Sequence, residues 1–598
     1  MAGYKAPLRD MRFVLYELLE ADKRLSTLPG WEDVTADLID PVLEEAAKLC
    51  EEVLHPLNRS GDEEGCHIEN GVVRTPKGFK AAYDAFAQGG WSSFTCAPED
   101  GGQGLPRTLG LMVQEMACAA NMAFAIYPGL TQGAYAALRV HASDELKRLY
   151  LPNMATGAWS GTMCLTEPHC GTDLGLLRTR AVPQADGSYK ITGTKIFISA
   201  GEHDLTENII HLVLARLPDA PKGIKGISLF LVPKFMPTAE GKPGPRNGVA
   251  CSALEHKMGI KASATCVLNF EDATGFLVGD LHKGMRAMFR MMNEARLAVG
   301  VQGLSVGEAA YQGAVAYARD RLQGRALDKP RYPDKPADPL LVHPDVRRML
   351  LTARAYVEGA RALAATISLK MDEATRSQDP AFKEEAEDLA AVMTPIIKAL
   401  FTDIGFDVAN IGVQIFGGHG YIREHGMEQY VRDARIAQIY EGANGIQALD
   451  LIGRKMPTNG GRALRRFFHP VAEFLETHAS DAAMADFIAP LAKAFGRLQQ
   501  ASGMIALQGL KNPMDAAAGA SDYLRLFGLV ALGHQWALMA KVAQAKLAAG
   551  ANGEDSFYKA KIATARFYMQ RILPQTGALL SAIGAGGKVL AEFDDAAF

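Results

Sequence analysis

The sequence IIHLVLARLPDAPKGIKGISLFLV, residues 209–232, holds two apolar runs separated by a stretch rich in Pro, Gly and Lys. Apolar runs of this length, bounded by turn residues, are typical of buried β-strands. Shorter strand-like runs lie at 189–191, 195–198 and 267–270. The segment 161–285 is therefore predicted to form a small antiparallel β-barrel or sandwich.

Helical patterns lie on both sides of this strand-rich segment. Before it, residues 41–49 have helical spacing, and residues 111–138 form a long apolar stretch that we expect to break near Pro128. After it, apolar residues recur at steps of three and four over 389–404, which predicts one buried helix face with a kink at Pro395.

The order of these patterns predicts an α+β fold with four domains. We expect an N-terminal helical domain over 1–160, the β-barrel over 161–285, a helical bundle over 286–455 and an extra C-terminal helical domain over 465–598. A polar, Pro-rich stretch over 328–339 is predicted to be a surface loop between two helices.

Composition is ordinary for a globular protein. The 598 residues are 48% hydrophobic and 22% charged, and the net charge is −4, which gives no reason to expect nucleic acid or an anionic membrane as a partner. None of the eight cysteines are spaced C-x-x-C, so we expect no metal site. No uncharged apolar run reaches the ~18 residues of a membrane span. The N-terminal residues include the acids Asp10, Glu17, Glu20 and Asp22, which signal peptides lack, and we expect a cytoplasmic protein without integral membrane association.

A polar segment precedes the first predicted strands. Residues 163–173, MCLTEPHCGTD, carry hydroxyl groups at Thr166 and Thr172 and a glycine at Gly171. These groups suit the polar edge of a ring and a phosphate, because glycine lets the main chain approach closely. The same composition is also typical of an ordinary loop.

A strand pattern over 195–201 would place Phe197 and Ser199 on one face. An aromatic ring beside a hydroxyl can stack on a flat heterocycle and hydrogen-bond to it. A single aromatic residue on a strand more often belongs to the core.

Two Gly-rich segments lie in the second helical region. In 414–421, QIFGGHGY, glycines would let a ligand press against a helix end, although a helix that simply ends at glycine is the alternative. In 440–445, YEGANG, the Glu441 carboxylate lies between an apolar run and a turn. A surface or capping glutamate is the alternative there.

In this order and spacing, the four segments resemble the acyl-CoA dehydrogenase family over about residues 40–455. The resemblance also includes PEDGGQG at 98–104 and KMGIK at 257–261. It implies an N-terminal helical domain, a central antiparallel β-barrel and a C-terminal four-helix bundle. It further implies FAD as the cofactor, an acyl-CoA substrate and a homodimer or homotetramer.

The resemblance also assigns roles to individual residues. It implies that Glu441 is the catalytic base that removes the α-proton of the acyl-CoA. The residues implied to bind FAD are Met163, Leu165, Thr166, Gly171, Thr172, Phe197, Ile198, Ser199, Arg321, Gln414, Gly417, Gly418 and Asn444. Those implied to bind the substrate are Thr172, Asn293, Arg296 and Gly442.

The chain departs from the family pattern in three places. Ala443 stands where many members have Thr, which removes one hydroxyl group. The stretch after Arg321 lacks the usual Phe-Gly and is followed by an insert, which removes part of the FAD contact expected from a neighbouring subunit. Ala295 occupies the position from which some branches supply the base, so Glu441 is favoured and Glu294 is the second candidate.

Residues 4–13, the insert around 239–251 and the extra C-terminal domain resemble one branch of the family. That branch converts 3-(methylthio)propanoyl-CoA to 3-(methylthio)acryloyl-CoA in dimethylsulfoniopropionate breakdown. The resemblance implies electron-transfer flavoprotein as the electron acceptor.

Two other functions are the alternatives. The first is a dehydrogenase or oxidase of ordinary short- to long-chain acyl-CoA. The second is a DNA-binding flavoprotein of the alkylation response. Residues 462–598 hold 14 basic and 11 acidic residues, which does not favour a nucleic-acid partner.

Overall fold

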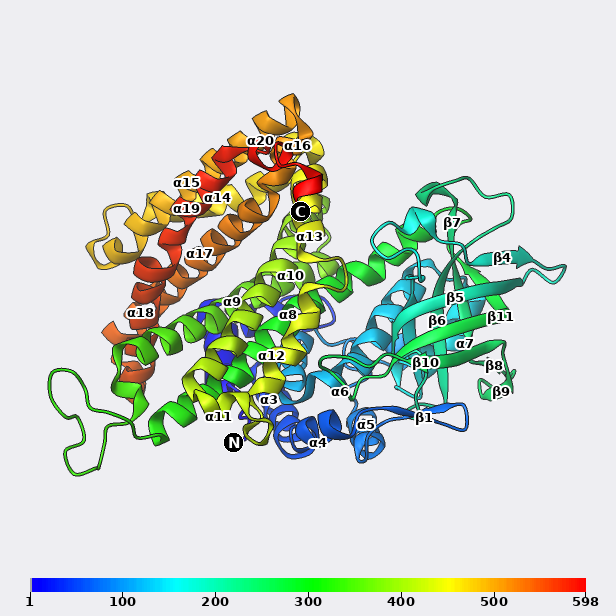
Figure 1. The fold of residues 1–598 in the computed structure, drawn as a ribbon, viewed down its shortest axis with the longest axis horizontal. Coiled ribbons are helices and arrows are strands. Elements are labelled where there is room, and N and C mark those ends of the chain that lie inside the picture. Colours follow the sequence, from blue (N-terminus) through cyan, green and yellow to red (C-terminus); the bar gives the residue numbers. More distant parts are fainter. Residues whose placement is uncertain (1–2) are drawn as a thin grey trace. The chain divides into compact units, whose positions relative to one another are not determined.

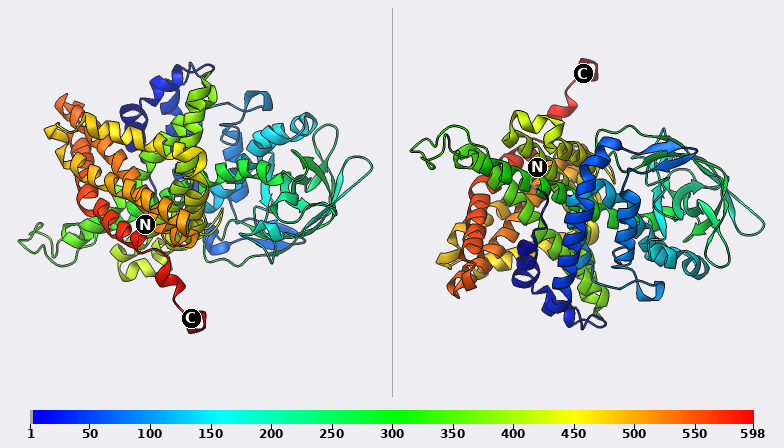
Figure 2. Two further views of the ribbon diagram at one scale, coloured as in Figure 1. Left: turned by 90° about the horizontal axis from the view of Figure 1, so that it is seen from above. Right: turned by 90° about the horizontal axis from the view of Figure 1, so that it is seen from below.

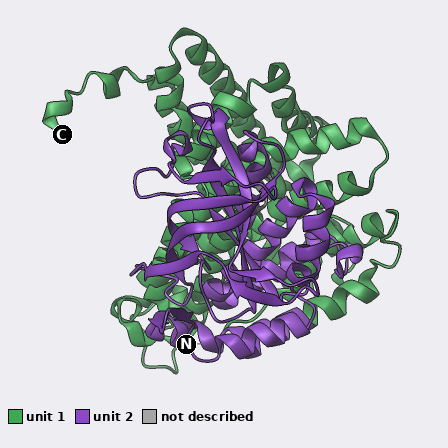
Figure 3. Ribbon diagram, turned by 90° about the vertical axis from the view of Figure 1, so that its right-hand side faces the viewer, with its two compact units in different colours: residues 1–44, 299–598 green, residues 45–298 purple. Residues whose placement is uncertain are grey.

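The computed structural model describes residues 3–598, apart from the side chains of Arg290, Asn293 and Glu294. The chain divides into two compact units (Figure 3). Unit 1 holds residues 1–44 and 299–598, and unit 2 holds residues 45–298. The first 44 residues therefore belong with the second half of the chain. The four domain boundaries given above stay a prediction.

Unit 2 combines helices with one large sheet (Figure 1). Its elements are α4 (Pro56–Glu64), β1 (His67–Glu69), β2 (Val72–Arg74), α5 (Phe79–Gln88), α6 (Arg107–His141), α7 (Asp144–Ala155), β3 (Trp159–Cys164), β4 (Arg180–Pro183), β5 (Tyr189–Ser199), β6 (Asn208–Arg216), β7 (Ile227–Pro233), β8 (Phe235–Pro237), β9 (Pro243–Arg246), β10 (Val249–Leu254) and β11 (Thr265–Val278).

All the predicted strand runs lie in strands. The runs 189–191 and 195–198 join in β5, while 209–214, 227–232 and 267–270 lie in β6, β7 and β11. Strand β7 is buried along its whole length, and β6 along all but its last residue. Burial on both faces explains why these two runs show no alternation of polar residues.

The sheet has the strand order β10-β11-β5-β4-β6-β3, and β7 pairs with both β11 and β6. Strand β3 runs parallel to β6, from Trp159–Asn208 to Cys164–Val213, and β4 meets β6 in parallel at Arg180–Arg216. The sheet is therefore mixed, and the prediction of an antiparallel barrel is wrong in this respect. Apolar runs predict where strands lie, but the pairing direction depends on the connections, and a long crossover permits parallel pairing.

The predicted break of helix α6 near Pro128 is also wrong. The helix continues through Pro128, and its non-helical residue is Asn121 (φ −160°, ψ 89°). The Asn121 side chain donates to the carbonyl of Leu54 at 3.2 Å and accepts from the N–H of Phe124 at 3.1 Å. Side-chain hydrogen bonds thus replace main-chain ones at the kink, which the sequence pattern did not indicate.

Unit 1 is helical among the residues that the structure describes (Figures 1 and 2). Its helices are α1 (Leu8–Arg12), α2 (Ala21–Ser26), α9 (Pro344–Arg376), α10 (Pro380–Phe416), α11 (Gly418–Tyr421), α12 (Met427–Arg435), α13 (Asn444–Asp450), α14 (Arg462–Thr477), α15 (Ala485–Lys511), α16 (Pro513–Ala518), α17 (Ala520–Ala548), α18 (Asp555–Phe567), α19 (Thr576–Ala585) and α20 (Lys588–Ala591). Helices α3 (Ala36–Leu49) and α8 (Gly284–Asp320) run across the boundaries between the two units.

Helix α10 is the central element of unit 1. It continues through Pro395 and packs against α9, α12, α13, α14 and α17. The predicted loop over 328–339 is confirmed as irregular chain between α8 and α9.

The extra C-terminal helices share the core of unit 1. The indole N–H of Trp536 in α17 donates to the carbonyl of Ala355 in α9 at 2.9 Å. A Cβ atom at Gly528 would lie 2.5 Å from a methyl carbon of Leu400 in α10. A larger residue at this crossing of α17 and α10 would have to displace the Leu400 side chain.

Buried charges join the N-terminal residues to this core. Asp10 of α1 binds both Arg361 of α9 and Lys561 of α18. Lys561 also binds Glu358 at 2.7 Å, and Arg361 also binds Glu308 at 2.6 Å. Because each buried charge has an opposite charge beside it, the cluster avoids the penalty of an unpaired buried ion.

Three helices, α6, α10 and α17, are long and apolar enough to cross a membrane by length and composition. In the folded chain, 89%, 67% and 78% of their most apolar windows are buried inside the protein.

Candidate active site

In unit 2, the segment that follows β3 is fixed by a buried ion pair. The Lys195 ammonium of β5 donates to the carbonyl of Leu165 at 2.9 Å and to the Glu167 carboxylate at 2.8 Å. Lys195 is 0% exposed and Glu167 is 3% exposed. The main chain at Leu165 and Thr166, predicted to meet the cofactor, is thereby tied to the adjacent strand.

The Glu167 carboxylate accepts three more hydrogen bonds. Its donors are the N–H of Arg178 at 2.7 Å, the N–H of Thr179 at 3.0 Å and the Thr179 hydroxyl at 2.6 Å. Burial alone would raise the pKa of Glu167, but the Lys195 charge and these donors hold that pKa below its ordinary value. The carboxylate therefore stays ionised and serves as the anchor of the segment.

Phe197 lies on an irregular part of β5. The pairing register shifts between Cys266–Ile198 and Leu268–Lys195, and Phe197 has a positive φ of 58°. This conformation costs a non-glycine residue about 1 kcal/mol and is uncommon. Phe197 is 59% exposed, whereas Ile198 is only 2% exposed. Any cofactor contact of Ile198 would therefore have to involve its main chain.

The bulge is joined directly to the polar segment. The N–H of Ile196 donates to the carbonyl of Thr166 at 2.9 Å. Ser199 is half-buried at the end of β5, and Met163 is half-buried in β3. Gly171 and Thr172 are exposed. The predicted cofactor residues of unit 2 thus gather along the ends of two strands.

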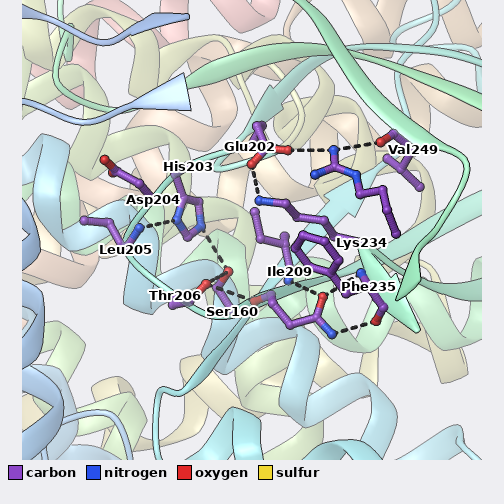
Figure 4. A network of polar contacts seen from close by, with 12 residues as sticks. Ser160, Glu202, His203, Asp204, Leu205, Thr206, Ile209, Lys234, Phe235 and Val249 are labelled. Atoms are coloured by element: carbon purple, nitrogen blue, oxygen red, sulfur yellow. Dashed lines mark hydrogen bonds and ion pairs between the residues drawn. The ribbon is translucent and has the colours of Figure 1, made fainter. Parts of the chain in front are cut away.

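A buried polar network supports the start of β3 (Figure 4). The Ser160 hydroxyl lies 3.0 Å from Nε2 of His203 and 3.1 Å from the Thr206 hydroxyl. In the same view, Glu202 binds Lys234 and accepts from Arg246 at 3.1 Å. Burial lowers the pKa of His203 to about 3, so this ring is neutral in the folded protein.

Glu167, His169 and Cys170 offer one possible metal-ligand group, with ligand atoms within 4.8 Å of one another. Both oxygen atoms of Glu167 already accept hydrogen bonds from the protein. This carboxylate is thus poorly suited to a metal ion.

In unit 1, Glu441 lies on a turn between short helical segments. It precedes α13, and both Glu441 and Gly442 have positive φ, 57° and 88°. The side-chain N–H of Gln447 donates to the carbonyls of Glu441 at 3.1 Å and Gly442 at 3.2 Å. The hydroxyl of Tyr440 donates to the side chain of Gln302. Hydrogen bonds therefore fix the left-handed turn both at Tyr440, before Glu441, and at Gln447, after it.

Helix α10 contributes further polar side chains to this turn. The buried Lys398 ammonium donates to the Gly442 carbonyl and to the Asn444 side-chain oxygen, both at 2.8 Å. The Asn444 amide nitrogen lies 3.0 Å from the Thr402 hydroxyl and 2.7 Å from the Asp403 carboxylate. Both polar atoms of the Asn444 side chain thus form hydrogen bonds within the protein. This reduces the hydrogen-bonding capacity that Asn444 could offer to the predicted cofactor.

A second group of predicted cofactor residues lies where α8 and α10 end. Arg321 follows α8, and Gln414, Gly417 and Gly418 lie at the end of α10, all of them exposed. The Tyr317 ring, one turn before Arg321, stacks on Phe416 with ring centres 4.1 Å apart. A Cβ atom at Gly417 or Gly418 would meet no atom within 4 Å, so a ligand can approach this main chain.

The predicted substrate residues of α8 are described in part. Arg296 is buried, with 6% of its surface exposed. The side chains of Asn293 and of the second candidate base, Glu294, lie outside the described residues.

Comparison with known proteins identifies the family. Four family models match successive segments: acyl-CoA dehydrogenase N-terminal domain over 40–158, middle domain over 162–273, C-terminal domain over 282–456, and acetyl-CoA dehydrogenase C-terminal-like over 467–594. The chain belongs to the acyl-CoA dehydrogenase family.

Full-length relatives support this membership. A Ruegeria pomeroyi protein named 3-methylmercaptopropionyl-CoA dehydrogenase is 45% identical over 98% of this chain and 99% of its own length. A broad-specificity linear acyl-CoA dehydrogenase of Mycobacterium tuberculosis is 35% identical over the whole of both chains. A Bacillus anthracis acyl-CoA dehydrogenase solved with FAD has a TM-score of 0.74 at 21% identity, over 96% of this chain and 91% of that chain. The last comparison shows a shared fold.

The residues of this acyl-CoA dehydrogenase fit FAD, the cofactor of the family. Phe197 presents an exposed aromatic ring from a bulged strand, beside main-chain groups that Lys195 and Glu167 fix in place. The glycines after α10 leave their main chain open to a ligand. A rigid aromatic surface and open main-chain positions are what a flat, phosphate-bearing cofactor needs.

The supporting roles of the buried lysines Lys195 and Lys398 in this dehydrogenase were not predicted from the sequence. Lys195 stands at the start of an apolar run, directly before Ile196, and Lys398 stands inside one, directly after Ile397. A lysine at a position that the hydrophobic pattern assigns to the core is rare unless it has partners. This signal would have drawn attention to both residues, although not to their partners.

Proposed function

We propose that this acyl-CoA dehydrogenase converts 3-(methylthio)propanoyl-CoA to 3-(methylthio)acryloyl-CoA. The observation that carries the proposal is the 45% identity over 98% of the chain with the Ruegeria protein named 3-methylmercaptopropionyl-CoA dehydrogenase. That likeness covers 98% of this chain, whereas a short-chain-specific relative from Clostridium acetobutylicum matches 52% of it.

Glu441 is proposed as the base that removes the α-proton. This proton is only weakly acidic, so the carboxylate must be held in line with the C–H bond in a site without bulk water. Support comes from the left-handed turn at Glu441 and Gly442, which Gln447 and Lys398 fix through their hydrogen bonds. A main-chain distortion maintained by so many contacts is typical of functional residues.

The thioester oxygen gains negative charge as the α-proton leaves. We propose that the main-chain N–H of Glu441 donates a hydrogen bond to this oxygen, as the family resemblance implies. A donor held in advance at such a position contributes on the order of 3–4 kcal/mol to transition-state stabilisation. FAD, when bound, supplies the acceptor for the hydride that leaves the β-carbon.

The remaining residues are proposed to bind and orient. Phe197 would lie against the cofactor ring, and Thr166 and Ser199 would offer hydroxyl groups to its polar edge. Arg321, Gln414, Gly417 and Gly418 would hold a distant part of the cofactor. Arg296, Thr172 and Gly442 would contact the substrate.

Anaerobic mixing with a panel of acyl-CoA thioesters tests the proposal. We expect 3-(methylthio)propanoyl-CoA to bleach the flavin absorbance near 450 nm faster than butanoyl-, octanoyl- or palmitoyl-CoA at equal concentration. Folded protein that takes up no FAD would contradict the cofactor assignment. Bleaching by straight-chain thioesters alone would contradict the substrate.

A dehydrogenase of ordinary acyl chains is the second candidate. The observation in its favour is the 35% identity with the broad-specificity enzyme of Mycobacterium tuberculosis. Oxygen uptake with substrate and no other acceptor would indicate an oxidase instead.

Electron-transfer flavoprotein is proposed as the electron acceptor on the family resemblance. A homodimer or homotetramer is proposed on the same basis, and the cytoplasmic location expected from the sequence is proposed as well. Reduction of purified electron-transfer flavoprotein, light scattering of the holoenzyme and cell fractionation test these three points separately.

A further inference from the structure

A lysine at the centre of α10 is completely buried. Lys398 is 0% exposed, and its ammonium group donates to the Gly442 carbonyl and the Asn444 side-chain oxygen, both at 2.8 Å. Burying an ammonium group is unfavourable unless strong hydrogen bonds replace its water shell. An apolar residue would fill the same space without this penalty, so the contact needs an explanation other than packing.

The two acceptors of Lys398 lie on the turn that carries Glu441. Gly442 is the next residue, and its φ of 88° continues the left-handed conformation of Glu441 at 57°. Asn444 is the first residue of α13. Lys398 therefore fixes the chain on the C-terminal side of Glu441 relative to α10.

A second layer of polar residues keeps Asn444 in place. Its amide nitrogen donates to the Ala399 carbonyl at 3.2 Å and to the Asp403 carboxylate at 2.7 Å. The Gln438 side chain donates to the same oxygen of Asp403, also at 2.7 Å. One turn of α10 thus bonds to the chain before and after Glu441.

We infer that Lys398 is a positioning residue for Glu441, through the Gly442 carbonyl and the Asn444 side chain. The inference rests on the proposed function of Glu441 as the α-proton base. Proton removal from carbon depends steeply on alignment, and a displacement of about 1 Å can reduce a rate by about 100-fold. A turn with two successive left-handed residues has no regular secondary structure to keep it in line, so side-chain hydrogen bonds must do so.

The matched control is the other buried lysine of unit 1. Lys561 is also 0% exposed, and it binds Asp10 and Glu358 in the cluster between α1, α9 and α18. Its loss should disturb the fold as much as the loss of Lys398. Neither Asp10 nor Glu358 belongs to the turn at 440–447, so a purely structural effect would be common to both variants.

The test compares Lys398→Met with Lys561→Met in the FAD-loaded full-length protein. One readout is the rate of flavin reduction by saturating acyl-CoA without oxygen. The second is exchange of the α-hydrogens of acetyl-CoA in D₂O, followed by mass spectrometry. Acetyl-CoA has α-hydrogens and no β-carbon, so its exchange reports proton removal alone.

Binding is measured separately with an S-alkyl-CoA thioether, which lacks the thioester carbonyl and cannot react. We expect Lys398→Met to slow both flavin reduction and α-hydrogen exchange by about 10–100-fold, while thioether affinity and FAD content stay within about twofold. Lys561→Met should lower the thermal midpoint but leave both rates within about twofold.

Unchanged α-hydrogen exchange in Lys398→Met would overturn the inference, and so would equal losses of rate in both lysine variants.

Should Lys398→Met fail to fold, the same exchange measurement on Thr402→Val tests the inference. This substitution keeps the side-chain shape but removes the hydroxyl that lies 3.0 Å from the Asn444 amide. We expect Thr402→Val to slow α-hydrogen exchange about three- to tenfold. An exchange rate equal to that of the wild type would overturn the inference. Wild-type protein that no acyl-CoA can bleach would instead contradict the proposed function.

Discussion

The strand segment at Phe197 and the turn at Glu441 share one arrangement. Each has a non-glycine residue with positive φ, 58° at Phe197 and 57° at Glu441. In each, a completely buried lysine donates to a main-chain carbonyl, Lys195 to Leu165 at 2.9 Å and Lys398 to Gly442 at 2.8 Å. The two lysines differ in their second acceptor. Lys195 also donates to the Glu167 carboxylate, whereas Lys398 also donates to the side-chain oxygen of Asn444.

The surroundings of the two regions also differ. Phe197 lies in β5, which pairs with β4 and β11, so the sheet itself limits how far the bulge can move. Glu441 lies on a turn whose position depends on the side chains of Lys398 and Gln447. Substitutions at Lys195 should therefore reduce stability and cofactor retention, whereas substitutions around Glu441 should mainly reduce the rate of the chemical step.

The largest effect is expected at the turn itself. Glu441→Gln keeps the side-chain shape and removes the base, so flavin reduction by acyl-CoA should slow by about 10²–10⁴-fold. FAD content and acyl-CoA binding should be unchanged. Stopped-flow absorbance measures the rate, with Glu294→Gln as the control. Near-normal reduction by Glu441→Gln together with failure of Glu294→Gln would reverse the assignment of the base.

At the strand, the sharpest test removes one partner of the ion pair. Lys195→Met leaves the Glu167 carboxylate buried beside an apolar group, which should destabilise the protein by about 3–5 kcal/mol. Less FAD should stay bound per chain after gel filtration. The double variant Lys195→Met/Glu167→Gln should recover part of the stability, because no uncompensated charge remains. A single variant as stable as wild type would show that the ion pair does not hold the segment.

Acid should affect the strand region through its buried histidines. Burial lowers the pKa of His203 and of His211 to about 3, against about 6.5 in the unfolded chain. Below pH 6.5 the unfolded chain binds the protons and the folded chain does not, so the free energy of unfolding falls as pH drops toward 3. At pH 5 the loss is about 2 kcal/mol for each histidine.

Hydrogen exchange of the main chain, corrected for its intrinsic pH dependence, measures this effect. Strands β3 and β6 should lose protection between pH 7.5 and pH 5. Replacing His211 by Gln should flatten the dependence. Equal protection of both strands at the two pH values would contradict the neutral buried rings.

The smallest effect is expected from the exposed ring. Phe197→Ala removes the aromatic surface but leaves the Lys195–Glu167 pair, so FAD affinity should fall about 2–10-fold, which corresponds to 0.5–1.5 kcal/mol. Phe197→Trp should retain the affinity of the wild type. Fluorescence titration of FAD into the apoprotein measures both. Unchanged affinity in Phe197→Ala would mean that the ring does not contact the cofactor.

The sequence by itself determined where the long apolar helices and strands lie. The apolar runs of β6 and β7 and the long helical face of α10 are local patterns. Apolar residues recur with the spacing of the helix or strand that buries them, so a short stretch of sequence is enough to reveal the element. The ordered motifs around Thr166, Phe197, Gln414 and Glu441 were sufficient to indicate the family, since each is a short contiguous string.

Tertiary structure alone decided which residues support those motifs. The parallel pairing of β3 with β6, the kink at Asn121 and the partners of Lys195 and Lys398 depend on contacts between residues far apart in the chain. Lys398 and Gly442 are separated by more than forty positions, and no periodic pattern connects them. A buried ammonium requires acceptors wherever the fold supplies them, so the sequence can indicate the need while only the folded chain provides the partner.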